Sequence, residues 1–237
     1  MAKALYMDDA YLKEFEATIT SVKDGRYIVL DKTAFYPNGG GQPHDTGTLL
    51  RDGETFRVVF TGKFSGDISH EVDKAGLKQG DKVQGIIDWD RRYALMRYHT
   101  AAHILSGVFN KEAGALITGN QLDIAKGRID FSLEEFDREK MAAYFEMAQA
   151  IAEKDLPIKV YYMDREEALH IPEMVKLAGV LPPAVKQLRI VDIEGFDRQA
   201  DGGTHVRSTR EIGKIVFTKA ENKGKNNRRV YYTLRTA

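Results

Sequence analysis

Short runs of alternating apolar and polar residues fill the first part of the chain, a pattern typical of half-buried β-strands. The runs EATITSV and RYIVLD are joined by a Lys-Asp-Gly turn, and the two halves of GTLLRDGETFRVVFTG are joined by Asp52-Gly53. Asp-Gly turns favour β-hairpins because both residues tolerate positive φ. Two further runs, ISHEVD and DKVQGIIDWD, follow. The pattern predicts a small antiparallel barrel or sandwich over residues 1–89.

After residue 90 the apolar positions change to helical spacing. Asp90 is a suitable N-cap, and the helix it opens carries apolar residues at spacings of three, four and seven, at Leu95, Ala102, Leu105 and Phe109. A second long helix, LEEFDREKMAAYFEMAQAIAEKD, is predicted to follow Ser132, because Glu135 three residues later would complete a capping box. The change of pattern predicts a second domain over residues 90–237.

Short strands and one short helix are predicted for the remainder of this second domain. PIKVYYM, KQLRIVDIEGF, IGKIVFTKA and RRVYYTLRT have strand patterns, and REEALH is a short helix. Two long helices followed by strands indicate an α+β domain in which the helices pack on an antiparallel sheet. The predicted fold class is α+β, with an N-terminal barrel ahead of this domain.

Composition narrows the functional classes. Hydrophobic residues make up 43% of the 237 positions and charged residues 30%, which favours a packed globular protein. The chain has no apolar run near the ~20 residues of a membrane span, and its first residues lack a signal-peptide core. Because there are no cysteines, any metal must be held by His, Asp, Glu or other oxygen donors. We expect a cytoplasmic protein with no membrane partner.

Charge is unevenly distributed although the net charge is zero. Residues 207–237 contain nine Lys or Arg and two Glu, a local balance of +7, so the rest of the chain carries −7. A basic end of this kind is typical of a surface that faces a polyanion, and equally of a solvated charged end.

Two histidines stand four residues apart in MRYHTAAHILSG. On a helix, His99 and His103 share one face, which is the geometry with which HExxH helices hold zinc. The residues between them are Thr, Ala and Ala, so the general-base glutamate of that protease motif is missing. The pair alone is compatible with half of a metal site or with two core histidines.

A second segment, FDRQADGGTHVRSTREIG, adds matching donors. Gly202 and Gly203 permit a tight turn and close approach of the backbone to a ligand, and Asp201 and His205 flank them. Three imidazoles and one carboxylate form a chemically suitable donor set for zinc.

These two segments, in this order, resemble a known family. HTAAHIL followed by DGGTHV and EIG resembles the editing domain of alanyl-tRNA synthetases and, more closely, the free-standing alanyl-tRNA editing proteins. In KTAFYPNGGGQPHDTGTL, the stretch FYP-x-GGGQ resembles the glycine-rich motif of the medium-length, two-domain class of these proteins. The resemblance covers nearly the whole chain.

The resemblance implies a zinc site made from an HxxxH helix and a CxxxH segment. His99, His103 and His205 match ligand positions, and Asp201 stands where many members have cysteine. Two alternatives follow from this departure. If Asp201 ligates, the site has four protein donors; if it is only a turn residue, three imidazoles leave an open position.

The implied activity is metal-dependent, ATP-independent hydrolysis of the ester between a wrong amino acid and alanine tRNA, in the service of translation fidelity. Serine and glycine are the expected errors, because a synthetase pocket rejects such small differences weakly. Zinc would either supply hydroxide or hold the substrate's amino group or ribose. Two rival functions remain: a zinc hydrolase of small esters, and a non-catalytic tRNA-binding module with a structural metal.

Further residues are assigned by the same resemblance. Thr33 and Gln42 are candidates for contacting a serine hydroxyl, although either could be a turn residue; Gln121 resembles a substrate-side position, and Thr204 could orient a ligand. The expected partner is the acceptor end of alanine tRNA, with no role for DNA. The cations predicted to contact its phosphates are Arg91, Arg92, Arg97, Lys214, Lys219, Lys223, Lys225, Arg228 and Arg229.

Overall fold

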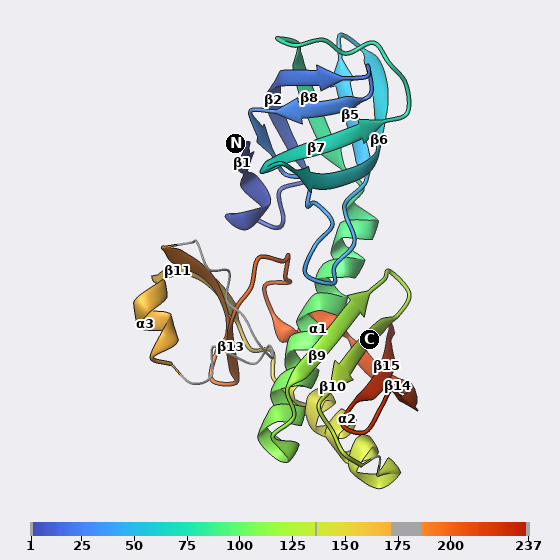
Figure 1. Ribbon diagram of the computed structural model, residues 1–237, viewed down its shortest axis with the longest axis vertical. Coiled ribbons are helices and arrows are strands. Elements are labelled where there is room, and N and C mark those ends of the chain that lie inside the picture. The colour runs from blue at the N-terminus through green and yellow to red at the C-terminus, as the bar shows by residue number, and fades with distance from the viewer. Residues whose placement is uncertain (1, 136, 172–185, 236–237) are drawn as a thin grey trace. The chain divides into compact units, whose positions relative to one another are not determined.

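The computed structural model describes residues 2–135, 137–171 and 186–235 of the chain (Figure 1). The residues form two compact units, 1–95 and 96–237, and each unit is described by itself. The division falls inside helix α1 (Trp89–Ala113). The boundary expected from the sequence, between residues 89 and 90, falls at the start of the same helix.

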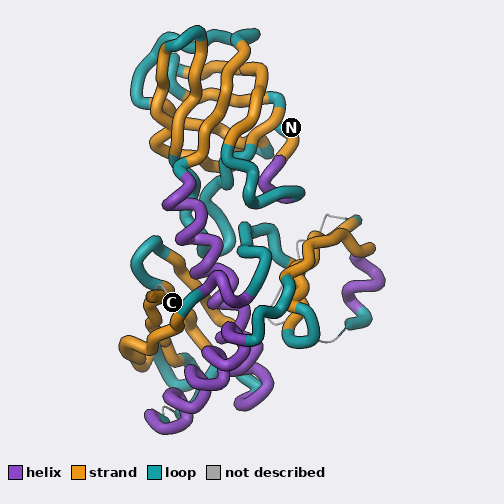
Figure 2. The backbone as a smooth tube through the Cα atoms, turned by 180° about the vertical axis from the view of Figure 1, so that it is seen from behind, coloured by secondary structure: helices purple, strands orange, loops and turns teal. Residues whose placement is uncertain are grey.

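Unit 1 contains a closed barrel of six strands, all paired in antiparallel fashion in the order β2-β3-β7-β6-β5-β8 (Figures 1 and 2). The strands are β2 (Glu14–Lys23), β3 (Tyr27–Leu30), β5 (Gly47–Arg51), β6 (Glu54–Phe64), β7 (Asp67–Val72) and β8 (Lys82–Ile87). β1 (Lys3–Ala4) pairs in parallel with β4 (Lys32–Thr33), and a 3₁₀ turn, η1 (Leu5–Met7), follows β1.

The barrel forms because its strands place alternate residues inside. Ile28 and Leu30 of β3 and Phe56 and Val58 of β6 are at most 1% exposed, whereas the residues between them are more exposed. The hairpin turn at Asp52-Gly53 has positive φ at both residues, as does the β2–β3 turn, as the sequence predicted. The predicted N-terminal barrel is confirmed.

In the part that the structure describes, unit 2 contains the longer part of α1, the helices α2 and α3, and two sheets. The four-stranded sheet has the order β14-β15-β10-β9 and the three-stranded sheet the order β11-β12-β13, with antiparallel pairing throughout. The elements are β9 (Ile117–Leu122), β10 (Gly127–Phe131), α2 (Arg138–Glu153), β11 (Ile158–Asp164), α3 (Arg165–Leu169), β12 (Gln187–Ile193), β13 (Asp197–Ala200), η3 (Thr209–Ile212), β14 (Lys214–Asn222) and β15 (Arg228–Arg235).

The two long helices pack on the four-stranded sheet through aromatic side chains. Phe109 of α1 stacks on Phe131 of β10 with ring centroids 4.2 Å apart, and Phe145 of α2 meets Phe217 of β14 at 5.2 Å. Aromatic rings combine large apolar area with specific edge and face contacts, so they fix the helices against the sheet. The predicted α+β architecture is confirmed.

The predicted start of the second helix was wrong. α2 begins at Arg138, and its N-cap is Asp137, whose carboxylate accepts the backbone N–H groups of Glu139 and Lys140. Ser132 instead accepts the N–H of Leu116. Two residues with N-cap chemistry precede this helix, and the carboxylate caps it.

Strands β9, β10 and β13 were not predicted either. The sequences ITGNQL and DRQA lack a clear alternation of apolar and polar residues, and the alternation in GRIDF extends over only Arg-Ile-Asp-Phe. Among the described residues, none of the helices combines the length and the apolar character that crossing a membrane requires.

Candidate metal centre

Helix α1 supplies the first two side chains of the candidate site. His99 and His103 lie one turn apart on the helix, and they are 2% and 5% exposed. Their ring centroids are 5.3 Å apart. Buried imidazoles four residues apart on one face are positioned to share a ligand.

The loop between β13 and η3 supplies the other two side chains, Asp201 and His205. Gly203 allows this loop to approach the helix, because a Cβ atom added there would lie 2.1 Å from Cε1 of His99 and 2.9 Å from Oδ1 of Asp201. The N–H of Gly203 donates to Asp201 Oδ1, which fixes the turn. Glycine is therefore required for close approach at this position.

The four side chains converge on one point. One ligand atom from each of His99, His103, Asp201 and His205 lies within 4.8 Å of the others. Asp201 Oδ2 is 3.5 Å from His99 Nε2 and 3.8 Å from His103 Nε2, and Asp201 Oδ1 is 3.2 Å from His205 Nε2. Ligand atoms at the corners of a zinc tetrahedron are about 3.3 Å apart, given bonds near 2.0–2.1 Å. The contacts to Asp201 are close to this spacing, so the four side chains lie near enough to share one small divalent cation.

Protonation also suits a cation. Burial lowers the pKa of His205 well below its usual value, and repulsion from His99 adds to the effect, so the imidazole is neutral. Burial alone would raise the pKa of Asp201, but electrostatic attraction to His99 and the contacts with the three surrounding imidazoles hold it well below its usual value. Neutral imidazole and ionised carboxylate are the forms that bind metals.

Thr100 orients one of the ligands. Its hydroxyl donates to the carbonyl of Met96 at 3.0 Å, and its oxygen lies 3.2 Å from His205 Nδ1. Because the hydroxyl proton is used, Thr100 Oγ1 accepts from His205 Nδ1–H, which leaves the Nε2 lone pair facing Asp201. This role could not be recognised from local patterns, because Thr100 and His205 are far apart in the chain.

The second ring nitrogen of His103 also bears on metal binding. His103 Nδ1 has no hydrogen-bond acceptor in the part of the chain that the structure describes. Where three imidazoles surround one carboxylate, the nitrogen and oxygen lone pairs that face one another outnumber the N–H protons available to bridge them. The residues present therefore fit a divalent metal ion, held by three nitrogens and one oxygen.

Thr33 lies in unit 1 and is fully buried. His70 Nδ1 is 2.9 Å from the carbonyl of Ile28, which makes Nδ1 the protonated nitrogen, so the Thr33 hydroxyl donates to His70 Nε2 at 2.8 Å. Thr33 Oγ1 also accepts the N–H of Phe35. Burial lowers the pKa of His70 to about 4, so its ring is neutral. Sequence reasoning missed His70.

The glycine-rich loop is closed by Gln42, which is 1% exposed and exchanges backbone hydrogen bonds with Gly39. Gly40 and Gly41 have φ of 58° and 82°, which glycine adopts at low cost. At the base of the loop, Asp45 accepts the N–H of Tyr36 at 2.6 Å. The three glycines and the buried glutamine thus form a defined turn within unit 1.

Arg92 anchors the same loop. Its guanidinium is fully buried and donates to both carboxylate oxygens of Asp45, at 3.0 and 2.9 Å from Nε, and to the carbonyl of Ala10. In this structure the side chain has no surface to offer to a phosphate. Neighbouring Arg91 is partly buried and donates to the carbonyl of His44.

Two further candidates lie in unit 2. Thr204 is fully buried between Gly203 and His205. Gln121 is exposed on β9, where its Oε1 accepts from Arg128 at 3.2 Å. It lines a hollow of about 340 Å³ together with Arg128 and Arg229.

The remaining predicted cations divide into two groups. Arg97 donates to the carbonyl of Ile212, Arg228 to carbonyls of the β14–β15 hairpin, and Arg229 to both oxygens of Asp130 at 2.7 and 2.8 Å. The exposed group is Lys214, Lys219, Lys223 and Lys225. The lysines of this second group are more exposed to solvent than the arginines, and Lys219 and Lys223 are also paired with Glu221.

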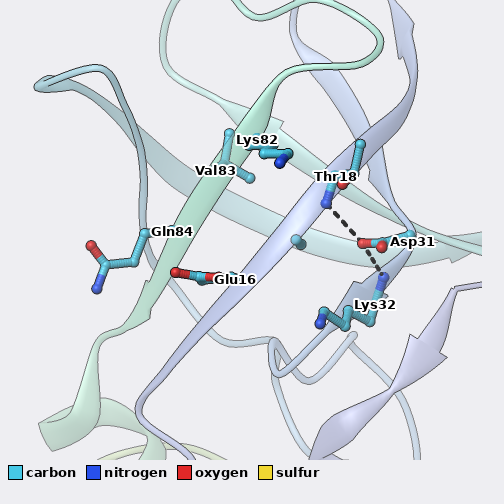
Figure 3. A pocket seen from close by; sticks show the side chains of 8 residues that line it. Glu16, Thr18, Asp31, Lys32, Lys82, Val83 and Gln84 are labelled. Atoms are coloured by element: carbon cyan, nitrogen blue, oxygen red, sulfur yellow. Dashed lines mark hydrogen bonds between the residues drawn. The ribbon is translucent and has the colours of Figure 1, made fainter.

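A hollow of about 330 Å³ is lined by residues of β2, β8 and the end of β3 to the start of β4 (Figure 3). There Asp31 Oδ1 accepts the backbone N–H groups of Thr18 and Lys32 at 2.8 and 2.9 Å, so this oxygen is used in hydrogen bonds to the backbone of β2 and β4. Unlike the metal centre, this hollow gathers no set of imidazoles among its lining residues.

Sequence relatives match the chain along almost its full length. It is 52% identical over 243 residues to the alanyl-tRNA editing protein AlaX-M of Methanosarcina mazei, covering 99% of this chain and 97% of the relative. Identity to the protein of the same name from Saccharolobus solfataricus is 47% over 239 residues, with 99% and 100% coverage. The alanine–tRNA ligase of Pyrobaculum calidifontis matches 92% of this chain at 39% identity, using 25% of its own length.

Two family models match separate parts of the chain. Residues 3–91 match the model described as class II (A) tRNA synthetases, and residues 188–231 match the second additional domain of threonyl and alanyl tRNA synthetases. The second match contains Asp201 and His205 of the metal centre. With the full-length relatives, these matches show that the chain belongs to the family of alanyl-tRNA editing proteins.

Proposed function

We propose that this protein is a trans-editing hydrolase that removes serine, and also glycine, from mischarged alanine tRNA, with a zinc ion held by His99, His103, Asp201 and His205. The observation that carries the proposal is the convergence of three buried imidazoles and one carboxylate within 4.8 Å. The name of the full-length relatives supports the substrate. Such a protein acts where tRNA is charged, so we place it in the cytoplasm.

The proposed reaction splits an ester without ATP. Water adds to the ester carbonyl, the bond to the ribose oxygen breaks, and the ribose hydroxyl and the free amino acid are released. An aminoacyl ester is already activated, so the protein mainly has to position and polarise it. A zinc ion at this place would supply Lewis acidity to water or to the substrate's ester and amino group.

The chain's own residues prepare the site for this chemistry. Thr100 holds His205 in the tautomer that presents Nε2, and Gly203 keeps the loop against the helix. The imidazoles are almost fully buried, whereas the Asp201 side chain is 21% exposed. The substrate is therefore proposed to approach from the side of Asp201.

Thr33 and Gln42 remain proposed determinants of the amino acid that is removed. Since the Thr33 hydroxyl donates its proton to His70 and accepts from the N–H of Phe35, only its remaining lone pair is left to interact with serine. Any contact with a serine hydroxyl would therefore have Thr33 as the acceptor. Gln121 and Thr204 are proposed to act on the substrate side and on the loop that holds His205.

For the tRNA we propose contacts with the exposed lysines Lys214, Lys219, Lys223 and Lys225. Their charge is presented on β14 and on the β14–β15 hairpin, where phosphates can reach it. Binding through phosphates releases counterions, so the affinity for tRNA is expected to fall as salt rises.

The direct test is deacylation of serine-charged alanine tRNA by the purified protein. Release of serine should be fast with the wild type, and at least a hundredfold slower after chelation of the metal or with His103→Ala. His170→Ala is the matched control, because His170 is an exposed histidine whose Nδ1 contacts the carbonyl of Glu166. Equal rates for His103→Ala and the wild type would remove the metal from the mechanism.

The same assay separates the two rival functions. A hydrolase of small esters would turn over a free serine ester without tRNA and ignore competition by uncharged alanine tRNA. A binding module would retain mischarged tRNA while leaving its ester intact. Our proposal requires hydrolysis that uncharged alanine tRNA inhibits.

A further inference from the structure

The Nδ1 atoms of His205 and His103 are satisfied unequally. His205 Nδ1 lies 3.2 Å from Thr100 Oγ1. His103 Nδ1 is buried and has no hydrogen-bond partner among the described residues. Its Nε2 faces Asp201 Oδ2 at 3.8 Å. A metal bound at Nε2 requires the proton on Nδ1, and a buried N–H without an acceptor is costly.

A second aspartate lies behind this nitrogen. Asp197, the first residue of β13, has a fully buried side chain, and its Oδ2 is 3.8 Å from His103 Nδ1. The carboxylate is thus on the opposite side of the imidazole ring from Asp201. A movement of less than ~1 Å would bring the two atoms to hydrogen-bond distance.

The surroundings hold Asp197 in this place. Gln199 Nε2 donates to Asp197 Oδ2 at 2.7 Å and lies 3.1 Å from Ser106 Oγ. Ser106 Oγ in turn donates to the carbonyl of His103. The amide of Gln199 thereby ties the carboxylate to the turn of α1 that carries the histidine.

Gly107 provides the space for this arrangement. It lies one turn after His103 on α1, and a Cβ atom added there would be 2.9 Å from the ring of Phe196 and 3.4 Å from Asp197 Oδ1. A larger residue would push β13 away from the helix. A glycine costs helix stability, and here it permits close packing of Asp197.

We propose that Asp197 is a positioning residue of the metal centre: it accepts the Nδ1–H of His103 and fixes the ring with Nε2 toward the cation. The inference rests on the metal site of the proposed function. Asp197 and Asp201 together supply two negative charges, which balance a divalent cation. Carboxylate–histidine–metal arrangements of this kind orient the ring and raise its basicity as a ligand.

The test is zinc affinity of the full-length protein, measured by competition with a chromophoric chelator. Asp197→Asn should weaken zinc binding by about 10-fold and Asp197→Ala by up to about 100-fold. Asp197→Glu should recover part of the loss. Asp192→Asn is the matched control, because Asp192 belongs to the same sheet and accepts from Arg198 rather than from a histidine.

A spectroscopic readout distinguishes orientation from general damage. In the cobalt-loaded protein, the visible d–d bands report ligand geometry, so Asp197→Asn should shift them while Asp192→Asn should not. If Asp197→Asn does not fold, Gln199→Met keeps the carboxylate but removes the donor that aims it. A loss of zinc affinity of about threefold or more is then expected, and unchanged affinity would overturn the inference.

The outcomes also separate this inference from the proposed function. If the wild type binds no zinc, the metal site itself fails and the role of Asp197 fails with it. If the wild type binds zinc and folded Asp197→Asn binds it equally well with unchanged cobalt bands, only the role of Asp197 is refuted.

Discussion

The barrel of unit 1 and the metal centre of unit 2 both bury polar side chains, but they satisfy them differently. In the barrel, His70 bonds the carbonyl of Ile28 through one ring nitrogen and the hydroxyl of Thr33 through the other. In the metal centre, His103 Nε2 lies 3.8 Å from Asp201 Oδ2 and its Nδ1 lies 3.8 Å from Asp197 Oδ2, so within the described part of the chain Nδ1 makes no hydrogen bond.

Charges show the same contrast. Asp45 and Arg92 form a fully buried pair whose charges cancel and whose hydrogen bonds also serve the backbone. Around Asp201, three imidazoles share a single carboxylate. A buried cluster that is complete by itself stabilises a fold, whereas one that needs an additional cation indicates a binding site.

The largest expected effect concerns the complete cluster. Asp45→Ala leaves the buried guanidinium of Arg92 without its counter-ion, and breaking a buried pair in this way costs about 3–5 kcal/mol. The free energy of unfolding, measured with urea, should fall by that amount. Glu194→Ala is the control, because its pair with Lys159 is exposed and such pairs contribute little. Equal losses in the two variants would contradict the structural role of Asp45.

The next effect is the pH dependence that His70 gives to the barrel. Its pKa is about 4 in the folded protein and near 6.5 in the unfolded chain, so the unfolded chain binds the proton first. The contribution of His70 to the free energy of unfolding is fully present above pH 6.5. It decreases as the pH drops through 6.5 and continues to decrease until about pH 4. The free energy of unfolding lost between pH 6.5 and pH 4 through His70 is about 3 kcal/mol.

The comparison that isolates His70 uses His70→Gln against the wild type. Urea unfolding at several pH values should give a shallower loss of stability between pH 6.5 and 4 in this variant, because the titrating group is gone. The exposed-histidine variant His170→Gln should follow the wild-type curve. Parallel curves for His70→Gln and the wild type would show that burial of His70 does not set the dependence.

A smaller effect sharpens the account of the metal centre. Asp201→Cys restores the donor that the family resemblance leads one to expect at this position, and thiolate is a softer ligand that zinc favours. We expect zinc affinity to rise by about tenfold, which is about 1.4 kcal/mol. Asp201→Ala should lower it. A cysteine variant that binds zinc no better than the alanine variant would argue that residue 201 only shapes the turn.

Local patterns predicted the barrel and most strands of unit 2, because alternation and Asp-Gly turns are encoded by neighbouring residues. The predicted beginning of α2 was wrong because two candidate N-cap residues, Ser132 and Asp137, lie close together in the chain, and it is the carboxylate of Asp137 that caps the helix. Strands such as β13, with the sequence DRQA, carry too little apolar pattern to be recognised. A strand of this kind forms because it pairs with a neighbouring strand, as β13 does with β12.

At the candidate site, the two histidine-containing segments could be identified from spacing and resemblance. The partners Thr100, His70 and Asp197 could not, because each acts on a residue distant in the chain or through a neighbour in another element. The burial of Arg92 could not be predicted from the sequence for the same reason, because its counter-ion Asp45 lies 47 positions away.

The measurement that tests the central claim most directly is the zinc content of the protein after equilibration with zinc and removal of the excess. The account predicts a single zinc ion on each wild-type chain and none on His103→Ala. A wild-type chain that retains no zinc, or a His103→Ala variant that retains as much as the wild type, would contradict it.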